Sequence, residues 1–349
     1  MPASIRDVAR YAGVTIGTVS RAFNGYDDIR SETKERILKI AEELGYVPNV
    51  SARSLSAKKP PNIALIISGL LDVDQKDNII YLLLQGVFSY TLANRLEIAV
   101  YATDSAEQHR KSYTQFCKEH SISGTILSGI TTDDAYLSEL LDTRVPCVAV
   151  DVSLKGRCLG WVSIDNILAA KQMVNHLFKL GHQNIMIVGG KKNAAVNLER
   201  MAGVCEAFAR QGLQKPKHII YADFAEQLAY KEIRAYLAAA PEQDLCTAFC
   251  CFSDIMALGV MAAVKDAGYR VPEDFSVTGF DGLAITEYIS PSLSTVVQDM
   301  RRIGYEAAKM LHQIMNGEEG AHKIIPHHLA VRGSSKAPRQ SRPESTLPL

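Results

Sequence analysis

The sequence is poor in the features that mark several classes of protein. Its seven cysteines show no C-x-x-C spacing, which argues against a common type of zinc or thiol redox site. No apolar run is long enough to cross a membrane, and no signal peptide is recognisable. Several cysteines lie in apolar segments, so we expect reduced core thiols, a cytoplasmic protein and no membrane partner.

Motifs of catalysis and cofactor binding are missing as well. The chain has no G-x-S-x-G nucleophile elbow and no H-E-x-x-H helix. Gly189-Gly190 is too sparse for a dinucleotide-binding loop, and the acidic segment that starts at Asp72 lacks the glycine and glutamate of a calcium loop. The histidines near the C-terminus have no partners at metal-ligand spacing. We therefore expect no enzyme, no metal and no cofactor.

Charge is balanced over the whole chain and uneven along it. Lys+Arg and Asp+Glu each number 38. Residues 1–60 hold ten basic and seven acidic side chains, a net charge of +3, which leaves 28 basic and 31 acidic side chains and a net charge of −3 for the rest. A mildly basic N-terminal segment suits contact with phosphates.

The first 25 residues have the pattern of two short helices around a tight turn. Ser4 is a helix N-cap, and Asp7 three residues later resembles the acidic arm of a capping box. Gly13 permits a sharp turn, and a second helix over residues 16–24 follows the N-cap Thr15. This is the pattern of a helix-turn-helix, whose second helix can enter a DNA major groove.

The second helix has one inward and one outward face. Val19, Ala22 and Phe23 are spaced to face the core. Among the outward residues, Ile16 can touch a thymine methyl and Arg21 can bond a guanine. On and around this face we expect DNA contacts from Thr15, Ile16, Gly17, Thr18, Ser20, Arg21 and Asn24.

A third helix should complete this N-terminal head. We expect it to run from an N-cap at Ser31 to Leu44 and to end at Gly45. Its predicted buried stripe is Ile37, Leu38, Ala41 and Leu44. A three-helix unit with a purely structural role is the alternative, and the joint pattern favours DNA binding.

A short basic segment follows the head. Pro48-Asn49 can start a helix and Pro60-Pro61 must end it, so barely two turns fit between them. Such a helix is marginal alone in water and can form when docked on DNA, with Leu55 wedged between base steps in the minor groove. The alternative is a basic linker with one exposed leucine. The predicted DNA contacts here are Ser51, Ala52, Leu55 and Lys58.

These motifs resemble the lactose/galactose-repressor (LacI/GalR) family. The matching segments are Asp7-Val8-Ala9, Ala12-Gly13-Val14, Thr18-Val19-Ser20-Arg21, Asn24-Gly25, Leu44-Gly45-Tyr46-Val47-Pro48-Asn49 and Ala52-Arg53-Ser54-Leu55. The resemblance implies a homodimeric or tetrameric transcription regulator. Its head binds near-palindromic operator DNA, its hinge helix inserts a leucine at the operator centre, and its body binds a small effector. Gly17 departs from the family pattern and leaves one base-reading position without a side chain.

From residue 62 onward, apolar β-branched runs alternate with helical patterns, which predicts parallel sheets with helices on both faces. Strands are expected at 63–68, 97–101, 124–127, 145–150, 185–188, 218–221, 247–252, 276–280 and 323–331. Helices are expected at 80–94, 166–180, 201–211, 228–239 and 254–267. The resemblance implies that these elements form an α/β body of two doubly wound parallel-sheet lobes, similar to periplasmic binding proteins, behind the all-α head.

The expected domain boundaries follow from these patterns. The helix-turn-helix domain takes residues 1–48, and the hinge helix with its linker takes 49–61. The N-terminal lobe takes 62–161 plus 293–322, and the C-terminal lobe takes 162–292 plus 323–332. Residues 333–349 are rich in Ser, Pro, Lys and Arg, so we expect a disordered tail, and they lack the leucine heptads of a tetramerising coiled coil.

Polar side chains recur just after the predicted strands. Ligands of open α/β sheets bind beyond the carboxyl ends of the strands, and carboxylates with an arginine and an aromatic ring suit a polyhydroxylated ligand. Helix capping is an equally good explanation for any single position. The expected effector contacts are Ser68, Asp72, Ser128, Asp151, Arg200, Phe224, Ser253, Asp254 and Asp281.

The resemblance implies effector-cleft positions for part of this set, namely Asp151, Arg200, Phe224, Ser253 and Asp281. Ser253 stands where the family usually has asparagine. We predict a homodimeric repressor of carbohydrate-metabolism genes that is controlled by a sugar or sugar derivative bound between the lobes. The alternatives are a sugar-binding receptor without a DNA role and a corepressor-dependent regulator of nucleobase metabolism.

Overall fold

The computed structural model describes residues 3–23, 29–46, 62–70, 79–241 and 244–338. Contacts divide the chain into two units, residues 1–61 and residues 62–349, and each is described by itself. The predicted hinge helix, with Ser51, Ala52, Leu55 and Lys58, lies outside the described residues. Asn24 and Asp72 lie outside them too.

The head is a three-helix unit built as its sequence predicts. Helices α1 (Ile5–Ala12), α2 (Ile16–Phe23) and α3 (Ser31–Glu43) pack around the fully buried Val8, Val19 and Ile37. The capping box of α1 is confirmed, because the Asp7 N–H donates to Ser4 Oγ and the Ser4 N–H donates to Asp7 Oδ2 at 2.9 Å. Gly13 ends α1 with φ +63°, in the left-handed region that glycine tolerates.

Two details of α3 correct the sequence prediction. Its N-cap is Arg30 rather than Ser31, and no side chain caps it. Leu38 is 40% exposed, so it is not part of the buried stripe. Ile37 and Ala41 are one turn apart on the buried face, and Ile40 rather than Leu38 packs beside them. The apolar residues of α3 are so closely spaced that the pattern alone did not show whether Leu38 or Ile40 lies on the buried face.

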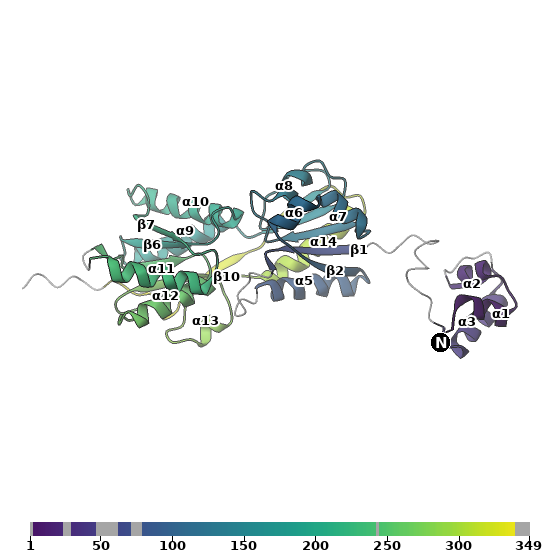
Figure 1. Ribbon diagram of the computed structural model, residues 1–349. Helices are drawn as coiled ribbons and strands as arrows, with labels where there is room; N and C mark the ends of the chain where they lie inside the picture. The colour runs from purple at the N-terminus through teal and green to yellow at the C-terminus, as the bar shows by residue number, and fades with distance from the viewer. Residues whose placement is uncertain (1–2, 24–28, 47–61, 71–78, 242–243, 339–349) are drawn as a thin grey trace, which may run out of the picture. The chain divides into compact units, whose positions relative to one another are not determined.

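The second unit consists of two lobes, each a six-stranded sheet between helices (Figure 1). The strand order is β11-β5-β4-β3-β1-β2 in the first sheet and β12-β10-β9-β8-β6-β7 in the second. All paired strands are parallel except β10 and β12. The predicted fold class is therefore confirmed.

The bounds of the elements are as follows. The first sheet contains β1 (Asn62–Ser68), β2 (Glu97–Thr103), β3 (Gly124–Ser128), β4 (Cys147–Val150), β5 (Leu159–Ser163) and β11 (His322–Ile324). The second contains β6 (Ile185–Gly189), β7 (His218–Tyr221), β8 (Ala248–Cys251), β9 (Ser276–Asp281), β10 (Ser294–Gln298) and β12 (His327–Ala330). The helices are α5 (Ile79–Ala93), α6 (Ser105–Arg110), α7 (Tyr113–Glu119), α8 (Ala135–Leu140), α9 (Asn166–Lys179), α10 (Ala195–Arg210), α11 (Glu226–Ala239), α12 (Asp254–Asp266), α13 (Ile285–Tyr288) and α14 (Met300–Met315).

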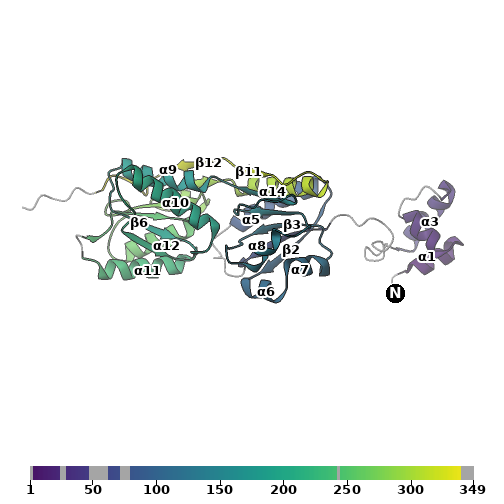
Figure 2. The ribbon, with the colours of Figure 1, turned by 90° about the horizontal axis from the view of Figure 1, so that it is seen from above.

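Helices cover both faces of the first sheet (Figure 2). On one face α5 and α14 lie so close that a Cβ on Gly304 would come within 2.2 Å of the Leu83 carbonyl oxygen. On the other face α7 and α8 pack through the buried rings of Tyr113 and Tyr136. Among the described residues, no helix combines the length and the apolarity that a bilayer crossing requires.

The chain passes between the lobes three times, after β5, after β10 and between β11 and β12. These crossings differ from the predicted lobe boundaries by a few residues. β5 continues through Ser163, β10 belongs to the second sheet, and the predicted strand 323–331 is two strands in different sheets. β5 and β10 were missed because each is short and interrupted by glycine, serine or threonine, so neither forms an apolar run.

The predicted disordered tail is wrong over its first residues. Ser334 is fully buried, its Oγ donates to the Val277 carbonyl at 2.6 Å, and the Ser294 N–H donates to Ser334 Oγ at 2.8 Å. The segment therefore serves as a polar brace along β9 and β10 as far as Lys336, whose N–H and carbonyl both bond to Ser276 Oγ. Its composition is misleading because short hydroxyl side chains can satisfy buried backbone groups without an apolar core.

Candidate functional site

A cavity of about 230 Å³ lies between the two lobes, where strands of both sheets end. It is lined by residues that follow β1, β3, β4, β6, β7, β8, β9 and β10, which is where ligands bind in open α/β sheets. The structure brings together most of the predicted effector contacts, namely Ser68, Ser128, Asp151, Arg200, Phe224, Ser253 and Asp281.

Asp254 is a predicted contact that the structure places elsewhere. Its side chain is fully buried, with Oδ1 accepting from Thr295 Oγ1 at 2.6 Å and Oδ2 accepting from the Leu283 N–H at 2.7 Å. The carboxylate therefore ties the start of α12 to β10 and to the loop after β9, and it does not line the cavity. Burial raises the pKa of Asp254 to about 7, while these hydrogen bonds oppose the rise.

Other lining residues were absent from the predicted set. Gln298 is the last residue of the missed strand β10 and Met300 follows it, while Lys191 and Asp223 follow β6 and β7. The signal at Asp223 was present, because it stands directly before the predicted Phe224. The remaining lining residues of the first lobe are mostly aliphatic and include Ile67, Ile79, Ile80, Ile130, Val150 and Val152.

Arg200 is the central cation of the site. It is 3% exposed, its guanidinium carbon lies 3.6 Å from the centre of the Phe280 ring, and its Nε donates to Asn166 Oδ1 at 3.0 Å. One terminal nitrogen donates to the Phe252 carbonyl. Burial lowers the pKa of Arg200, and the carboxylates of Asp281 and Asp151 oppose that shift. The ion is therefore held in place by a ring, an amide and a carbonyl before any ligand arrives.

Two acids flank this cation, the buried Asp281 and the half-buried Asp151. Burial raises the pKa of Asp151, while a 2.6 Å hydrogen bond from Ser163 Oγ and the nearby Arg200 oppose the rise. Asp281 accepts a hydrogen bond from Gln298 Nε2 at 2.8 Å. Carboxylates that are buried beside an arginine keep their charge only through such partners, and they are strong acceptors for hydroxyl groups.

Gln298 has one amide atom that the protein does not satisfy. The residue is 7% exposed, and Oε1 has no hydrogen-bond partner, while Nε2 is held by Asp281. A buried acceptor without a donor is unfavourable by about 1–3 kcal/mol. Because Gln298 lines the cavity, a ligand hydroxyl or N–H group can supply the missing donor.

Backbone strain is concentrated at the same place. Of the six non-glycine residues with positive φ in the described part of the chain, four line the cavity: Asp151, Asp223, Phe224 and Asp281. Such conformations are unfavourable by about 1–3 kcal/mol each and persist where the surroundings enforce them, typically at binding sites. The Phe224 ring also lies on Gly190, where a Cβ would come within 2.0 Å of it.

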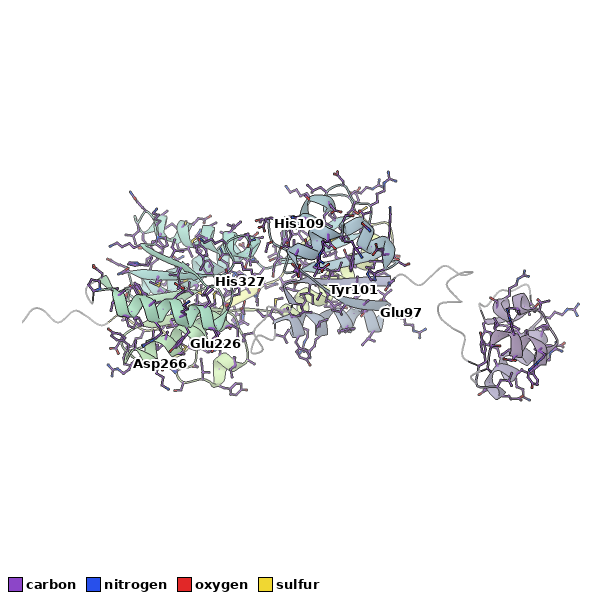
Figure 3. The ribbon with its side chains drawn as sticks, viewed as in Figure 1. Glu97, Tyr101, His109, Glu226, Asp266 and His327 are labelled. Carbon is purple, nitrogen blue, oxygen red and sulfur yellow. The ribbon has the colours of Figure 1, made fainter. Side chains whose placement is uncertain are left out.

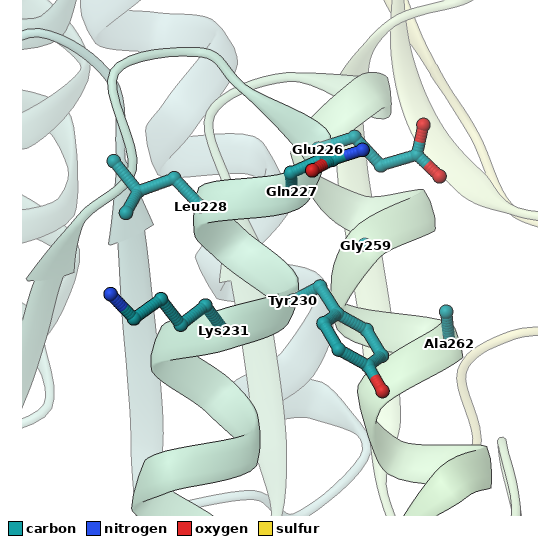
Figure 4. Close-up of a pocket in the computed structure, with 7 residues that line it drawn as sticks. All are labelled: Glu226, Gln227, Leu228, Tyr230, Lys231, Gly259 and Ala262. Carbon is teal, nitrogen blue, oxygen red and sulfur yellow. The ribbon is translucent and has the colours of Figure 1, made fainter.

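A second hollow, of about 630 Å³, lies on the second lobe between α11 and α12 (Figure 4). It is larger but shallow, and Tyr230, Lys231 and the small Gly259 form its walls. Figure 3 shows Glu226 and Asp266 on this helical surface. None of its lining residues is a buried charge, so the interlobe cavity is the better candidate for a small ligand.

The head presents a separate candidate surface. Thr15, Gly17 and Arg21 are exposed on or beside α2, and Ile16 is 45% exposed, whereas Val19 and Ala22 are buried. The predicted division of α2 into an inward and an outward face is confirmed. Thr15 caps the helix, since its Oγ1 accepts from the Thr18 N–H at 3.2 Å. Within the residues that the structure describes, no cluster of His, Cys, Asp and Glu could hold a metal.

Known proteins resemble both parts of the chain. Residues 4–49 match the lacI family of bacterial regulatory proteins, and residues 174–335 match a periplasmic binding protein-like domain. The HTH-type transcriptional regulator CelR of Thermobifida fusca is 31% identical, over 94% of this chain and 96% of its own. The HTH-type transcriptional repressor CytR of Escherichia coli K12 is 30% identical, over 96% of this chain and 97% of its own.

Solved structures agree with these relatives. The Lac repressor dimer bound to operator and the anti-inducer ONPF superposes with a TM-score of 0.81 at 26% identity, covering 97% of this chain and all of that one. The complex of the regulator CelR with cellobiose gives a TM-score of 0.72 at 26% identity, covering 95% of this chain and all of the other. The chain therefore belongs to the lacI family of bacterial regulatory proteins, and it is a DNA-binding transcriptional regulator.

Proposed function

We propose that this regulator is a homodimeric repressor that acts in the cytoplasm by binding rather than by catalysis. Its two heads bind a near-palindromic operator, and a small hydroxylated molecule, a carbohydrate, binds in the interlobe cavity. The observation that carries the proposal is that one chain contains both a binding cavity and an exposed recognition helix. The cavity is lined by the buried Arg200 and Asp281 and by residues with strained backbone conformations.

The outward face of α2 supports base reading. Ile16 offers an exposed apolar side chain and Arg21 an exposed cation, which suit a thymine methyl and a guanine edge. Gly17 has open space around it, because a Cβ there would meet only Thr15 Oγ1 at 3.7 Å. Packing of the head therefore does not require glycine. Wedging by Leu55, and contacts from Asn24, Ser51, Ala52 and Lys58, remain part of the proposal on residues outside the described ranges.

Helix α5 supports the homodimer. Leu83 and Val87 bury one face of this helix against the first sheet, yet Leu92 is 74% exposed and Tyr81 is 60% exposed on the other. A helix that is apolar all round is stable only when both faces are covered. A second copy of the chain would cover the outer face and would place two heads on two half-sites.

The cavity supports a hydroxylated effector. Asp151 and Asp281 are acceptors, Arg200 is a donor, and Gln298 Oε1 lacks a donor, which together match a ligand with several hydroxyl groups. The solved complex of the related CelR holds cellobiose, a carbohydrate. We infer that effector binding shifts the relative pose of the lobes and thereby changes DNA affinity.

The test is selection of binding sites from a random DNA pool with the full-length protein. The expected result is a palindrome of two half-sites. Arg21→Ala should weaken the selected palindrome at least tenfold more than a scrambled duplex, because a base contact carries sequence information and a phosphate contact does not. Arg36→Ala, which removes another exposed arginine of the head, is the matched control and should not discriminate between the two duplexes.

The effector is then found by titrating mono- and disaccharides and nucleobases into the complex with the selected operator. A carbohydrate that releases the DNA supports the proposal. A nucleobase that strengthens binding would instead favour the corepressor alternative. If no sequence is enriched with or without these compounds, the proposed operator binding is wrong.

A further inference from the structure

The two lobes touch beside the cavity through two short segments. Thr131–Asp133 follows β3 in the first lobe, and Asn193–Ala195 precedes and opens α10 in the second. Thr131 and Ala194 form an isolated antiparallel bridge. The N–H and the hydroxyl of Thr132 both donate to the Asn193 carbonyl, at 2.8 and 3.0 Å. We name these two segments the latch.

A side-chain bond completes the latch. Asn193 Nδ2 donates to Asp133 Oδ1 at 2.6 Å, and Thr131 Oγ1 donates to the same oxygen at 2.7 Å. These hydrogen bonds lower the pKa of Asp133, so the acceptor is a carboxylate at neutral pH. Hydrogen bonds to an ionised acceptor are stronger than those between neutral groups.

The first-lobe segment of the latch is fixed by hydrogen bonds to the buried Asp134. Asp134 is 3% exposed and accepts from the Thr131 N–H at 3.0 Å and from Ser105 Oγ at 2.6 Å. Ser68 Oγ donates to the same carboxylate at 3.4 Å, and Ser68 lines the cavity. The turn that carries Thr132 is therefore a fixed part of the first lobe rather than a loose loop.

The second-lobe segment of the latch also contacts the core of the first lobe. Ala195 packs against the smaller core cluster of the first lobe, which contains Tyr136 and Ile130. Ala194 and Ala195 line the cavity on one side, and Thr131 lines it on the other. The latch therefore joins the lobes at the wall of the ligand site.

We propose that the latch sets the balance between joined and separated lobes, and that a ligand acts on this balance because Thr131 and Ala194 belong to both the latch and the cavity wall. The latch bonds join residues of different lobes, so they must break when the lobes separate there. That this equilibrium controls DNA binding rests on the proposed function. That the latch sets the equilibrium between joined and separated lobes does not.

The test is hydrogen exchange at the Thr132 amide in the full-length protein, measured by mass spectrometry with fragmentation that resolves single amides. This amide donates across the gap, so it exchanges through lobe separation, and its rate follows the separated fraction. The neighbouring Thr131 amide donates to Asp134 within the first lobe and serves as the internal reference. No ligand or DNA is needed.

In the parent protein, Thr132 should exchange at least tenfold more slowly than an unstructured amide. Asn193→Ala removes the bond to Asp133 and should speed exchange at Thr132 about fivefold, with Thr131 unchanged. Thr132→Val removes the hydroxyl bond and should act similarly. Asn184→Ala is the matched control, because it breaks amide bonds within the second lobe only.

Three results would overturn the proposal. The first is exchange of Thr132 at the unstructured rate in the parent. The second is the parent rate in both latch variants. The third is faster exchange of Thr131 and Thr132 together, which indicates local fraying. Each result stands whether or not an operator is found. Failure of the latch is therefore distinguishable from failure of the proposed DNA binding.

Discussion

The two lobes have the same strand order and contribute different chemistry to the cavity between them. Strands β2-β1-β3-β4-β5 of the first sheet correspond in order to β7-β6-β8-β9-β10 of the second, and only the last strand differs in direction. Yet the first lobe contributes a single type of charge to the cavity wall, the carboxyl group of Asp151, beside several isoleucine and valine side chains. The second lobe contributes charges of both signs, from Lys191, Arg200, Asp223 and Asp281. Topology determines where strands end, and the residues at those ends determine what each lobe can bind.

Packing of the helices is one feature that the lobes share. In the first lobe, Gly304 brings α14 against the Leu83 carbonyl. In the second lobe, Gly203 brings α10 against the Ile167 carbonyl, where a Cβ would come within 2.1 Å. Each lobe therefore depends on a glycine where two helices cross, even though their cavity walls are unlike.

The largest expected loss of stability comes from removing Arg200, the buried cation of the second lobe. Arg200→Met leaves the buried Asp281 and the half-buried Asp151 without their cation, so we expect the free energy of unfolding to fall by about 3–5 kcal/mol. Urea denaturation measures the change. Arg210→Met alters an exposed arginine of the same helix and should stay within about 0.5 kcal/mol. A loss below about 1 kcal/mol for Arg200→Met would contradict the central role of this ion.

The second prediction concerns the glycine that each lobe has where two helices cross. Gly304→Ala and Gly203→Ala both force a methyl group into a backbone carbonyl, so each should lower the free energy of unfolding by about 1–3 kcal/mol. Gly17→Ala is the matched control, because the methyl group meets open space in a helix and should stabilise the head by up to about 1 kcal/mol. Thermal unfolding compares the three. If the core variants behave like Gly17→Ala, close helix packing is not what these glycines provide.

The smallest effect concerns pH and the second lobe. Burial lowers the pKa of His182, against a hydrogen bond with the Lys336 carbonyl that raises it. The unfolded chain therefore takes up a proton at His182 near pH 6.5 before the folded chain does, so this residue should lower stability as the pH drops below about 6.5. Melting temperatures at pH 7.5 and pH 5.5 give the size of the drop. His182→Gln should show a smaller drop than the parent.

His176 and His327 shift in the same direction through burial, so part of the drop should remain in the His182 variant. An unchanged drop in His182→Gln would show that His182 does not contribute. Asp254 acts in the opposite direction between these pH values, because its raised pKa lets the folded chain take up a proton first. The test is therefore the difference between the parent and His182→Gln and not the sign of the total change.

Elements with local signals could be predicted from a short stretch of residues. Ser4 with Asp7, Gly13 and the apolar run of β1 each satisfy their own backbone or bury their own side chains, so a short window of sequence contains the reason for the structure. The recognition face of α2 follows in the same way from helical spacing. Most of the predicted cavity residues were found because strand ends converge in any parallel sheet.

Other features depend on contacts between residues that are far apart in the chain. β10 and the brace at Ser334 are stable because distant residues satisfy their polar groups, which no local pattern reveals. The same holds for Asp254 and Gln298. Both are polar residues at element ends. Asp254 accepts hydrogen bonds from Thr295 and Leu283, whereas Gln298 lines the cavity with an unsatisfied oxygen. Whether a polar group braces the fold or faces a ligand depends on which partners folding brings to it, because a buried hydrogen-bonding group must be satisfied by one or the other.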